Sequence, residues 1–127
     1  MNCEVRKYQK LNELAETNGI VVFGGREDMN IFLGELRQAF AIEQKMYNRS
    51  IAGLSVKDAV AVYDECVAPI TPETVLIHIG EADRKFFDAH PSEFDNRYRE
   101  LLSHIKSQNK KCRIAVVSLR NYESDPQ

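Results

Sequence analysis

The chain has 127 residues, of which 43% are hydrophobic and 28% are charged. This length suits one domain, and the composition excludes a disordered or fibrous chain. The formal net charge of -2 leaves no basic excess to neutralise phosphates, so we expect no nucleic-acid partner.

A helix is predicted in the first part of the chain. Apolar residues recur there at helical spacing: Tyr8, Leu11, Leu14 and Ala15. The pattern runs up to residues 17–19, where an asparagine and a glycine favour the left-handed conformation that ends a helix. We therefore expect a helix with one apolar face that ends near this point.

A buried strand and a second helix are predicted next. Residues 20–23 form a continuous, β-branched run that breaks at Gly24-Gly25, which is typical of a strand covered on both faces of a parallel sheet. Glu27 and Asp28 suit the first turn of a helix. An apolar stripe predicts the face on which that helix packs: Ile31, Phe32, Leu36 and Phe40.

Strands and helices continue to alternate along the rest of the chain. Further strands are predicted at residues 46–51, 74–79 and 113–119, and Ser55 and Ser92 suit the caps of the helices between them. The alternation predicts right-handed crossovers and a parallel sheet covered by helices on both faces. The inward-facing residues of the two helices are expected to be Val56, Ala59, Val60 and Tyr63, then Phe94, Tyr98, Leu101, Leu102 and Ile105.

The cysteines and the first residues indicate the compartment. Cys3, Cys66 and Cys112 are odd in number and far apart, which suits neither a disulfide framework nor a metal cluster. The segment MNCEVRKYQKLNELAE carries charges where a signal peptide needs an apolar run, and no stretch approaches the roughly 18 apolar residues of a membrane span. We expect a cytoplasmic protein with reduced thiols, no membrane contact, no metal and no cofactor.

Ligand sites of parallel α/β sheets lie beyond the carboxyl ends of the strands. The turns at this edge are expected at residues 24–28, 50–55 and 80–83, and from Leu119 onward. We therefore look for functional residues in these four turns.

Five separated segments of the chain form a recognisable set. They read IVVFGGRED (20–28), YNRSIAGLS (47–55), VLIHIGEAD (75–83), DNRYRELLSHIK (95–106) and RIAVVSLRN (113–121). In order and spacing they resemble the SGNH/GDSL hydrolases, especially small bacterial acylhydrolases similar to the platelet-activating-factor acetylhydrolase subunits. The resemblance implies a three-layer α/β/α fold with a flavodoxin-like parallel sheet in the order 2-1-3-4. It also implies a single domain over residues 1–127 that lacks the family's last strand and helix.

The departures from the family pattern fall at its catalytic positions. The resemblance places Arg26 where the family has its nucleophilic serine, and a guanidinium is not a nucleophile. Ala82 stands where an asparagine donates to the oxyanion, the oxyanion glycine is kept as Gly53, and the catalytic Asp-x-x-His has no counterpart. These losses predict a pseudoenzyme that serves as a binding or interaction module. Its vestigial pocket is expected to comprise Gly24, Gly25, Arg26, Gly53, Ser55, Gly80, Glu81, Ala82 and Asp83.

The alternative is a weak ester hydrolase for small acyl esters that uses substitute residues or a partner chain. The candidates are Asp88 and His90, with Ser50 or Ser55 beside Gly53 as a hydroxyl. Against them, the spacing is Asp-x-His, and neighbouring loop residues seldom form a base and its orienting acid. We therefore expect a solvent-exposed helix start at Asp88 and His90.

The other reactive side chains have simpler interpretations. His78 lies inside a predicted strand and is interpreted as a core histidine whose ring is satisfied. His104 is interpreted as a solvated surface residue. Cys66 is expected to be a packing residue rather than a reactive thiol, because no cationic partner is evident.

Arg26 permits one further hypothesis, a site for a small anionic or acyl ligand. It lies in a glycine turn before a predicted helix, where backbone N–H groups and a guanidinium can bind a carboxylate or phosphate. The simpler alternative is an ion pair between Arg26 and one of its neighbouring acids: Glu27, Asp28, Glu81 or Asp83.

The predicted strand order leaves the fourth strand at an edge of the sheet. A hydrophobic strand such as residues 114–119 should not stay exposed there, because its unpaired backbone groups can pair with another chain. We expect a homodimer through this strand, or that the chain is a fragment of a longer product.

Overall fold

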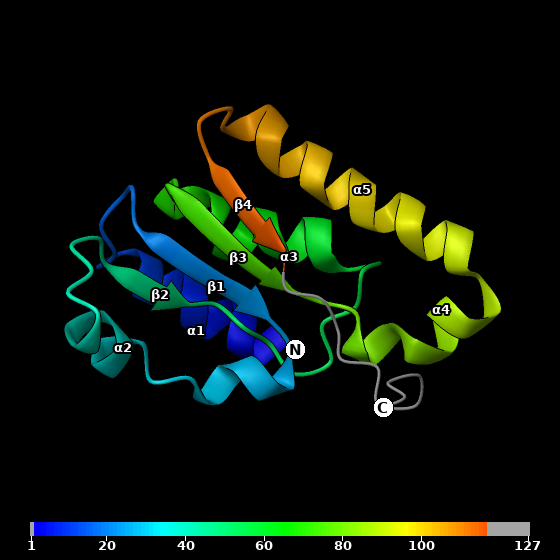
Figure 1. The fold of residues 1–127 in the computed structure, drawn as a ribbon, viewed down its shortest axis with the longest axis horizontal. Coiled ribbons are helices and arrows are strands. Elements are labelled where there is room, and N and C mark those ends of the chain that lie inside the picture. Colours follow the sequence, from blue (N-terminus) through cyan, green and yellow to red (C-terminus); the bar gives the residue numbers. More distant parts are fainter. Residues whose placement is uncertain (1, 117–127) are drawn as a thin grey trace.

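A parallel sheet forms the centre of the fold (Figure 1). The structure, a computed structural model, describes residues 2–116, apart from the side chains of residues 2, 3, 27, 30 and 81. Its strands are β1 (Ile20–Gly24), β2 (Met46–Asn48), β3 (Thr74–His78) and β4 (Arg113–Val116). They lie in the order β2-β1-β3-β4 and all pair in parallel. This confirms the predicted strand order and the three-layer α/β/α class with a flavodoxin-like sheet.

Helices connect and flank the strands. The α-helices are α1 (Asn2–Asn12), α2 (Leu33–Ala39), α3 (Ala59–Cys66), α4 (Arg84–Ala89) and α5 (Pro91–Gln108). Short 3-10 helices are η1 (Arg26–Asn30), η2 (Ala68–Ile70) and η3 (Glu81–Asp83). The α4 helix was not predicted, because its six residues are too few to show a helical period.

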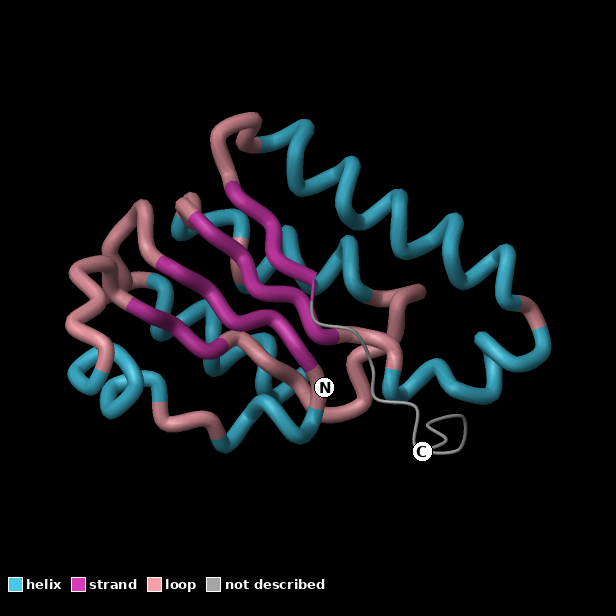
Figure 2. Tube along the Cα trace, in the orientation of Figure 1, coloured by secondary structure: helices cyan, strands magenta, loops and turns pink. Residues whose placement is uncertain are grey.

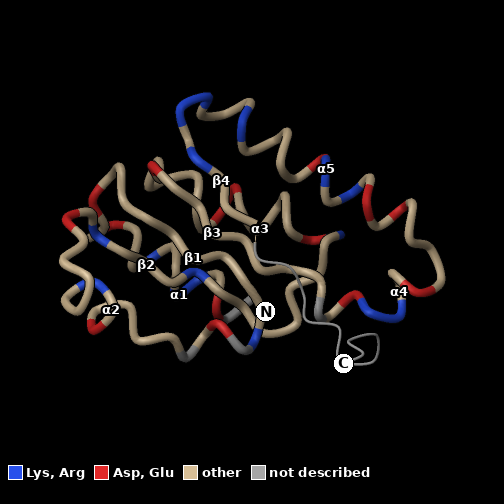
Figure 3. The backbone as a smooth tube through the Cα atoms, viewed as in Figure 1, with Lys and Arg blue, Asp and Glu red and all other residues tan. Residues whose placement is uncertain are grey.

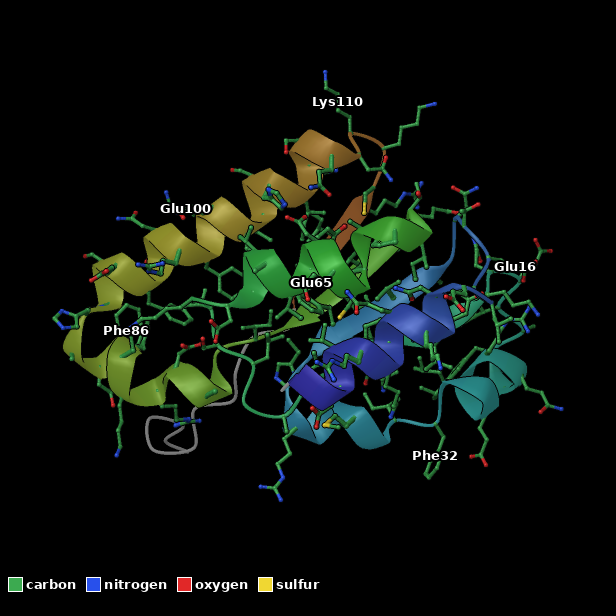
Figure 4. The ribbon with its side chains drawn as sticks, turned by 180° about the vertical axis from the view of Figure 1, so that it is seen from behind. Glu16, Phe32, Glu65, Phe86, Glu100 and Lys110 are labelled. Atoms are coloured by element: carbon green, nitrogen blue, oxygen red, sulfur yellow. The ribbon has the colours of Figure 1, made fainter. Side chains whose placement is uncertain are left out.

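The two faces of the sheet are covered unequally. From behind, α1, α3 and α5 lie side by side over one face (Figure 4), while α2 packs beside β2 and η1 beside β1. Along β3, Val75 and Ile77 are buried, whereas the alternate residues are only half-buried. The main core therefore lies between the sheet and α1, α3 and α5. Its fully buried large side chains include Tyr63, Phe23, Ile51, Leu54, Ile77, Leu101 and Ile105.

The first helix ends earlier than the helical spacing predicted. It stops at Asn12, whose side chain donates to Cys66 O at 2.8 Å and accepts from Arg49 Nη2 at 2.8 Å. Leu11 is exposed, and Leu14, which lies beyond the helix, is 85% exposed. The expected apolar face is therefore wrong at these two residues, because the tertiary contacts of Asn12 hold the chain at the end of the helix.

The stripe from Ile31 to Phe40 is not the buried face of one helix, as the sequence predicted. Two separate helices, η1 and α2, occupy this region, with Ile31 in extended backbone between them. Phe32 and Phe40 are 73% and 72% exposed, and Leu33 is the buried residue of α2. The short edge strand β2 gives α2 little surface to cover, which leaves the stripe in solvent.

Neither predicted serine cap is used. The α3 helix begins at Ala59, and the Ser55 hydroxyl donates instead to the Asp58 carboxylate at 3.1 Å. The α5 helix begins at Pro91, so Ser92 lies inside its first turn. Proline is favoured at the first helical position because the N–H that it lacks has no helical partner there.

The remaining observations concern the surface and the end of the described chain. Positive and negative side chains are interspersed along the backbone (Figure 3). Within residues 2–116, no helix combines the length and the apolar character needed to cross a membrane. The last part of the predicted fourth strand, after Val116, and the predicted turn from Leu119 onward lie outside the described residues.

Candidate functional site

The loops that follow β1, β2 and β3 meet at the carboxyl edge of the sheet (Figure 2). Ile51 N–H donates to Gly24 O at 3.0 Å, and Gly24 N–H donates to Ser50 Oγ at 3.1 Å. The Asp83 carboxylate accepts from Val56 N–H at 2.8 Å. These bonds bring three of the predicted turns together at one edge.

Arg26 is exposed at the start of η1. Its guanidinium makes no hydrogen bond or ion pair with any other side chain that the structure describes. Two of the acids considered as its partners, Asp28 and Asp83, bond to His78 and Val56 instead. The alternative of an ion pair with either of these two acids is therefore wrong.

An imidazole–carboxylate pair, which the sequence analysis did not predict, joins the first and third turns. His78 Nδ1 lies 3.0 Å from Asp28 Oδ2 and 3.2 Å from Asp28 Oδ1. The His78 and Asp28 side chains are 20% and 12% exposed, so solvent reaches the edge of the pair. The ring of His78 is satisfied, as interpreted, but by a carboxylate in a half-buried position rather than deep in the core.

Gly24 gives the Asp28 carboxylate room to reach His78. It lies opposite His78 in the register of β1 and β3, and a Cβ at Gly24 would lie 2.2 Å from Asp28 Oδ2. The same oxygen accepts from Gly25 N–H at 3.1 Å. A signal for the pair was present in the sequence, because Asp28 follows one strand and His78 ends its neighbour, but only the strand order brings them together.

The serines proposed as substitute nucleophiles are both engaged. Ser50 is fully buried, and its Oγ accepts from Gly24 N–H. Its own N–H donates to Asn48 Oδ1 at 3.0 Å, while Asn48 Nδ2 donates to Asp28 O at 2.6 Å. Ser55 donates to a carboxylate. These bonds make Ser50 and Ser55 parts of the turn structure.

The third turn carries a buried carboxylate next to Ala82. Ala82 and Gly53 are exposed, whereas only 4% of Asp83 is exposed. Burial raises the pKa of Asp83, and the opposing effects of the Val56 N–H and the Lys57 charge are smaller. Asp83 therefore ties this turn to the second turn.

Asp88 and His90 do not form a dyad. Both are exposed, at the end of α4 and just before α5, and no hydrogen bond joins them. The His90 ring lies 5.8 Å from the Phe86 ring, centroid to centroid. This agrees with the expectation of a solvent-exposed helix start.

His104 differs from its interpretation as a solvated surface residue. Its Nε2 lies 2.6 Å from Asp64 Oδ1, which also accepts from Gln108 Nε2 at 2.9 Å, and its ring meets Tyr63 edge to face. Cys66 is fully buried, and burial raises its pKa to about 11, which fits a packing role. Within the described residues, no three potential ligands gather as a metal site would require.

One surface hollow lies along α5, away from the strand ends. Its volume is about 600 Å³, and it opens along α5, whose outward side is marked by Glu100 in Figure 4. It is lined by Asn96, Arg99, Glu100, Ser103, His104 and Ser107. None of the expected pocket residues contributes to it.

Solved structures match this chain, whereas no family model and no curated protein sequence does. A platelet-activating-factor-like protein from Streptococcus pneumoniae is 19% identical, with a TM-score of 0.76, over 93% of this chain and 54% of its own. A GDSL-like lipase from Parabacteroides merdae is 19% identical, with a TM-score of 0.60, over 80% and 59%. An acetyl xylan esterase from Geobacillus stearothermophilus is 20% identical, with a TM-score of 0.56, over 87% and 66%.

These likenesses concern the fold. The chain has the fold of the SGNH/GDSL hydrolases, as the resemblance implied. It spans about half of the length of the streptococcal protein that it matches, 54%.

Proposed function

On the basis of this fold, we propose that the chain is a degenerate SGNH/GDSL-type domain that binds a small anionic or acyl ligand. In this proposal the domain binds the ligand without hydrolysing it and forms no covalent intermediate with it. The observation that carries the proposal is Arg26, an exposed cation in the turn after β1 that makes no ion pair with the described residues. A guanidinium with free donors is suited to carboxylate or phosphate.

Chemical shift mapping with acetate and phosphate tests the binding site. We expect shifts centred on Gly24 and Gly25 in the wild-type protein, and their loss in Arg26→Gln. Arg99→Gln removes another exposed arginine, on α5, and should keep them. An unchanged spectrum at saturating anion would reject the site.

Labelling with a fluorophosphonate tests the absence of a nucleophile. We expect no covalent adduct, because Arg26 stands at the nucleophile position and Ser50 is buried and bonded. A stoichiometric adduct, located by mass spectrometry, would contradict the proposal.

A weak ester hydrolase is the second candidate. The Asp28–His78 pair favours it, since a histidine oriented by a carboxylate is a general base in many enzymes. Two of the matching structures are acetyl xylan esterases, and another is an esterase active on acetylated mannans. Hydrolysis of short-chain nitrophenyl esters separates the two candidates, because the binding domain should be inactive.

We also propose a reducing, cytoplasmic compartment. Cys66 and Cys112 are both free and buried, which suits thiols that stay reduced. Mass spectrometry after alkylation of the protein from cells should find both thiols unmodified by oxidation.

A further inference from the structure

We propose that His78 and Asp28 form a proton-accepting pair that activates water to hydrolyse small acyl esters, with no covalent intermediate. The inference deepens the second candidate function and rests on it. It assigns His78 as the base and Asp28 as its positioning residue.

The Asp28 carboxylate orients the imidazole of His78. His78 Nδ1 lies 3.0 Å from Asp28 Oδ2, so the pair holds the proton on Nδ1 and leaves the lone pair on Nε2. Nε2 has no hydrogen-bond partner in the described part of the chain. The His78 side chain is 20% exposed, so part of it is accessible to solvent.

Neighbouring residues hold the pair of His78 and Asp28 from several sides. The Asp28 carboxylate accepts from Gly25 N–H, and Asn48 donates to Asp28 O. Gly24 leaves the space through which the carboxylate approaches. A base that keeps its geometry loses less free energy to reorganisation when the proton moves.

His78 also lies where ligands of this type of sheet bind. His78 ends β3 at the carboxyl edge of the sheet, opposite Gly24 and next to the turn that carries Arg26. Ligands of parallel α/β sheets bind beyond this edge. Arg26 is on the same short helix as Asp28, and in this proposal its exposed guanidinium stabilises the negative charge that develops on the carbonyl oxygen of an ester under attack.

The proposed hydrolysis consumes only the ester and one molecule of water. A water oxygen forms a bond to the ester carbonyl carbon as one of its protons passes to His78 Nε2. The bond from that carbon to the alcohol oxygen then breaks, and the imidazolium returns the proton to the leaving alkoxide. The products are a carboxylic acid and an alcohol, and the protein is unchanged.

The other two described histidines serve as matched controls. His90 is exposed and has no carboxylate partner among the described residues, and His104 Nε2 bonds to Asp64 between α3 and α5. Among the described residues, Asp28 is the titratable group in contact with His78. Catalysis by His78 should therefore be lost when His78 is replaced, be weakened when Asp28 is replaced, and persist in both controls.

The test measures hydrolysis of 4-nitrophenyl acetate against pH. We expect His78→Gln to lower the rate at least tenfold, which is less than the factor of about 10²–10⁴ typical of a general base because background hydrolysis also contributes. Asp28→Asn should lower the rate, because the neutral amide holds the proton on His78 Nδ1 less firmly than the carboxylate does. His90→Gln and His104→Gln should retain both the rate and its dependence on pH.

Two glycine substitutions test the geometry of the pair without altering His78 or Asp28. Gly24→Ala places a Cβ 2.2 Å from Asp28 Oδ2 and should lower the rate as Asp28→Asn does. Gly34→Ala, whose Cβ meets nothing within 4 Å, should leave the rate unchanged. If His78→Gln does not fold, the tautomer of His78 in the wild-type protein decides, measured by long-range nitrogen–proton NMR.

Protonated Nδ1 with bare Nε2 at neutral pH is the tautomer expected, and the reverse overturns the proposal. A rate that persists in His78→Gln also overturns it but leaves the second candidate function standing. A wild-type rate no higher than that of buffer removes both.

Discussion

Asp83 is a buried acid that accepts a hydrogen bond from one main-chain N–H group. Its carboxylate accepts from Val56 N–H at 2.8 Å while only 4% of the residue is exposed. Asp83→Ala should therefore lower the free energy of unfolding by roughly 1–3 kcal/mol, the cost of leaving a buried donor unpaired. Urea denaturation measures this difference, and an unchanged midpoint would refute the assignment.

Asp83→Asn separates the hydrogen bond from the charge. The amide oxygen that this substitution introduces still accepts, so the loss should be smaller than in Asp83→Ala. Burial raises the pKa of Asp83, so the folded state binds its proton more tightly than the unfolded state does. The unfolding free energy of the wild-type protein should then fall as pH rises from the ordinary aspartate pKa to the raised one. Asp83→Asn should lack this fall, which denaturation at a series of pH values would detect.

Asp64 predicts the opposite pH dependence. Burial opposes its ionisation, but hydrogen bonds from His104 and Gln108 outweigh burial and lower the pKa of Asp64. Its contribution to stability is therefore present above the unfolded pKa, about 4, and is lost as pH falls through the lowered pKa. Because Asp64 is 42% exposed, screening keeps that contribution below about 1 kcal/mol.

Asp64→Asn tests this sign. The variant should be slightly less stable than the wild type at neutral pH and should lose less stability on acidification. Thermal unfolding at neutral and acidic pH measures both differences. Equal acid sensitivity in the two proteins would exclude Asp64 as the source.

At the scale of elements, Gly19 is the residue before β1 and lies against Lys45, the residue before β2. A Cβ there would lie 2.8 Å from the Lys45 carbonyl oxygen, which accepts from Ile20 N–H at 2.7 Å. Gly19→Ala should cost about 1–3 kcal/mol, because backbone must move to remove the overlap. Gly34→Ala meets open space in α2 and should instead stabilise by up to about 1 kcal/mol. Chemical denaturation of both variants compares them directly.

The exposed stripe around α2 predicts that its aromatic residues contribute little to stability. Phe32 is 73% exposed, whereas Phe23 of β1 is fully buried. Phe32→Ala should change the unfolding free energy by less than about 0.5 kcal/mol. Phe23→Ala should lower it by roughly 3–5 kcal/mol. Similar losses in the two variants would show that α2 packs more closely than described.

At the scale of the whole molecule, β4 lies at an edge of the sheet among the described residues. Val116 on this strand is 49% exposed. We propose that the edge pairs with a second copy of the chain, so light scattering at micromolar concentration should give about twice the chain mass of 14.6 kDa. Val116→Lys should shift the protein toward the monomer. A monomeric wild-type protein would count against edge pairing.

The sequence was sufficient for the presence and order of the described strands and for the turns that carry the candidate site, although β2 ends at Asn48 rather than at residue 51. A continuous β-branched run such as residues 20–23 predicts its own conformation, and the order of five segments identified the topology. Arg26, Gly53 and Ala82 were located in the expected turns for the same reason. The buried faces of helices were predicted less well. The spacing of apolar residues indicates which of them share a helix face, but it does not indicate whether another element packs on that face. Phe32 and Phe40 share such a spacing and are both exposed.

By itself, the sequence determined the fold class, since local runs of residues predict the strands and helices that alternate along the chain. Only the tertiary structure decided which acids and bases meet. Asp28 and His78 lie 50 residues apart along the chain, and the pairing of β1 with β3 places them 3.0 Å apart. Hydrogen bonds act over a few ångströms in space, whatever the separation in sequence, and so the proton-accepting pair became visible only once the strands were arranged.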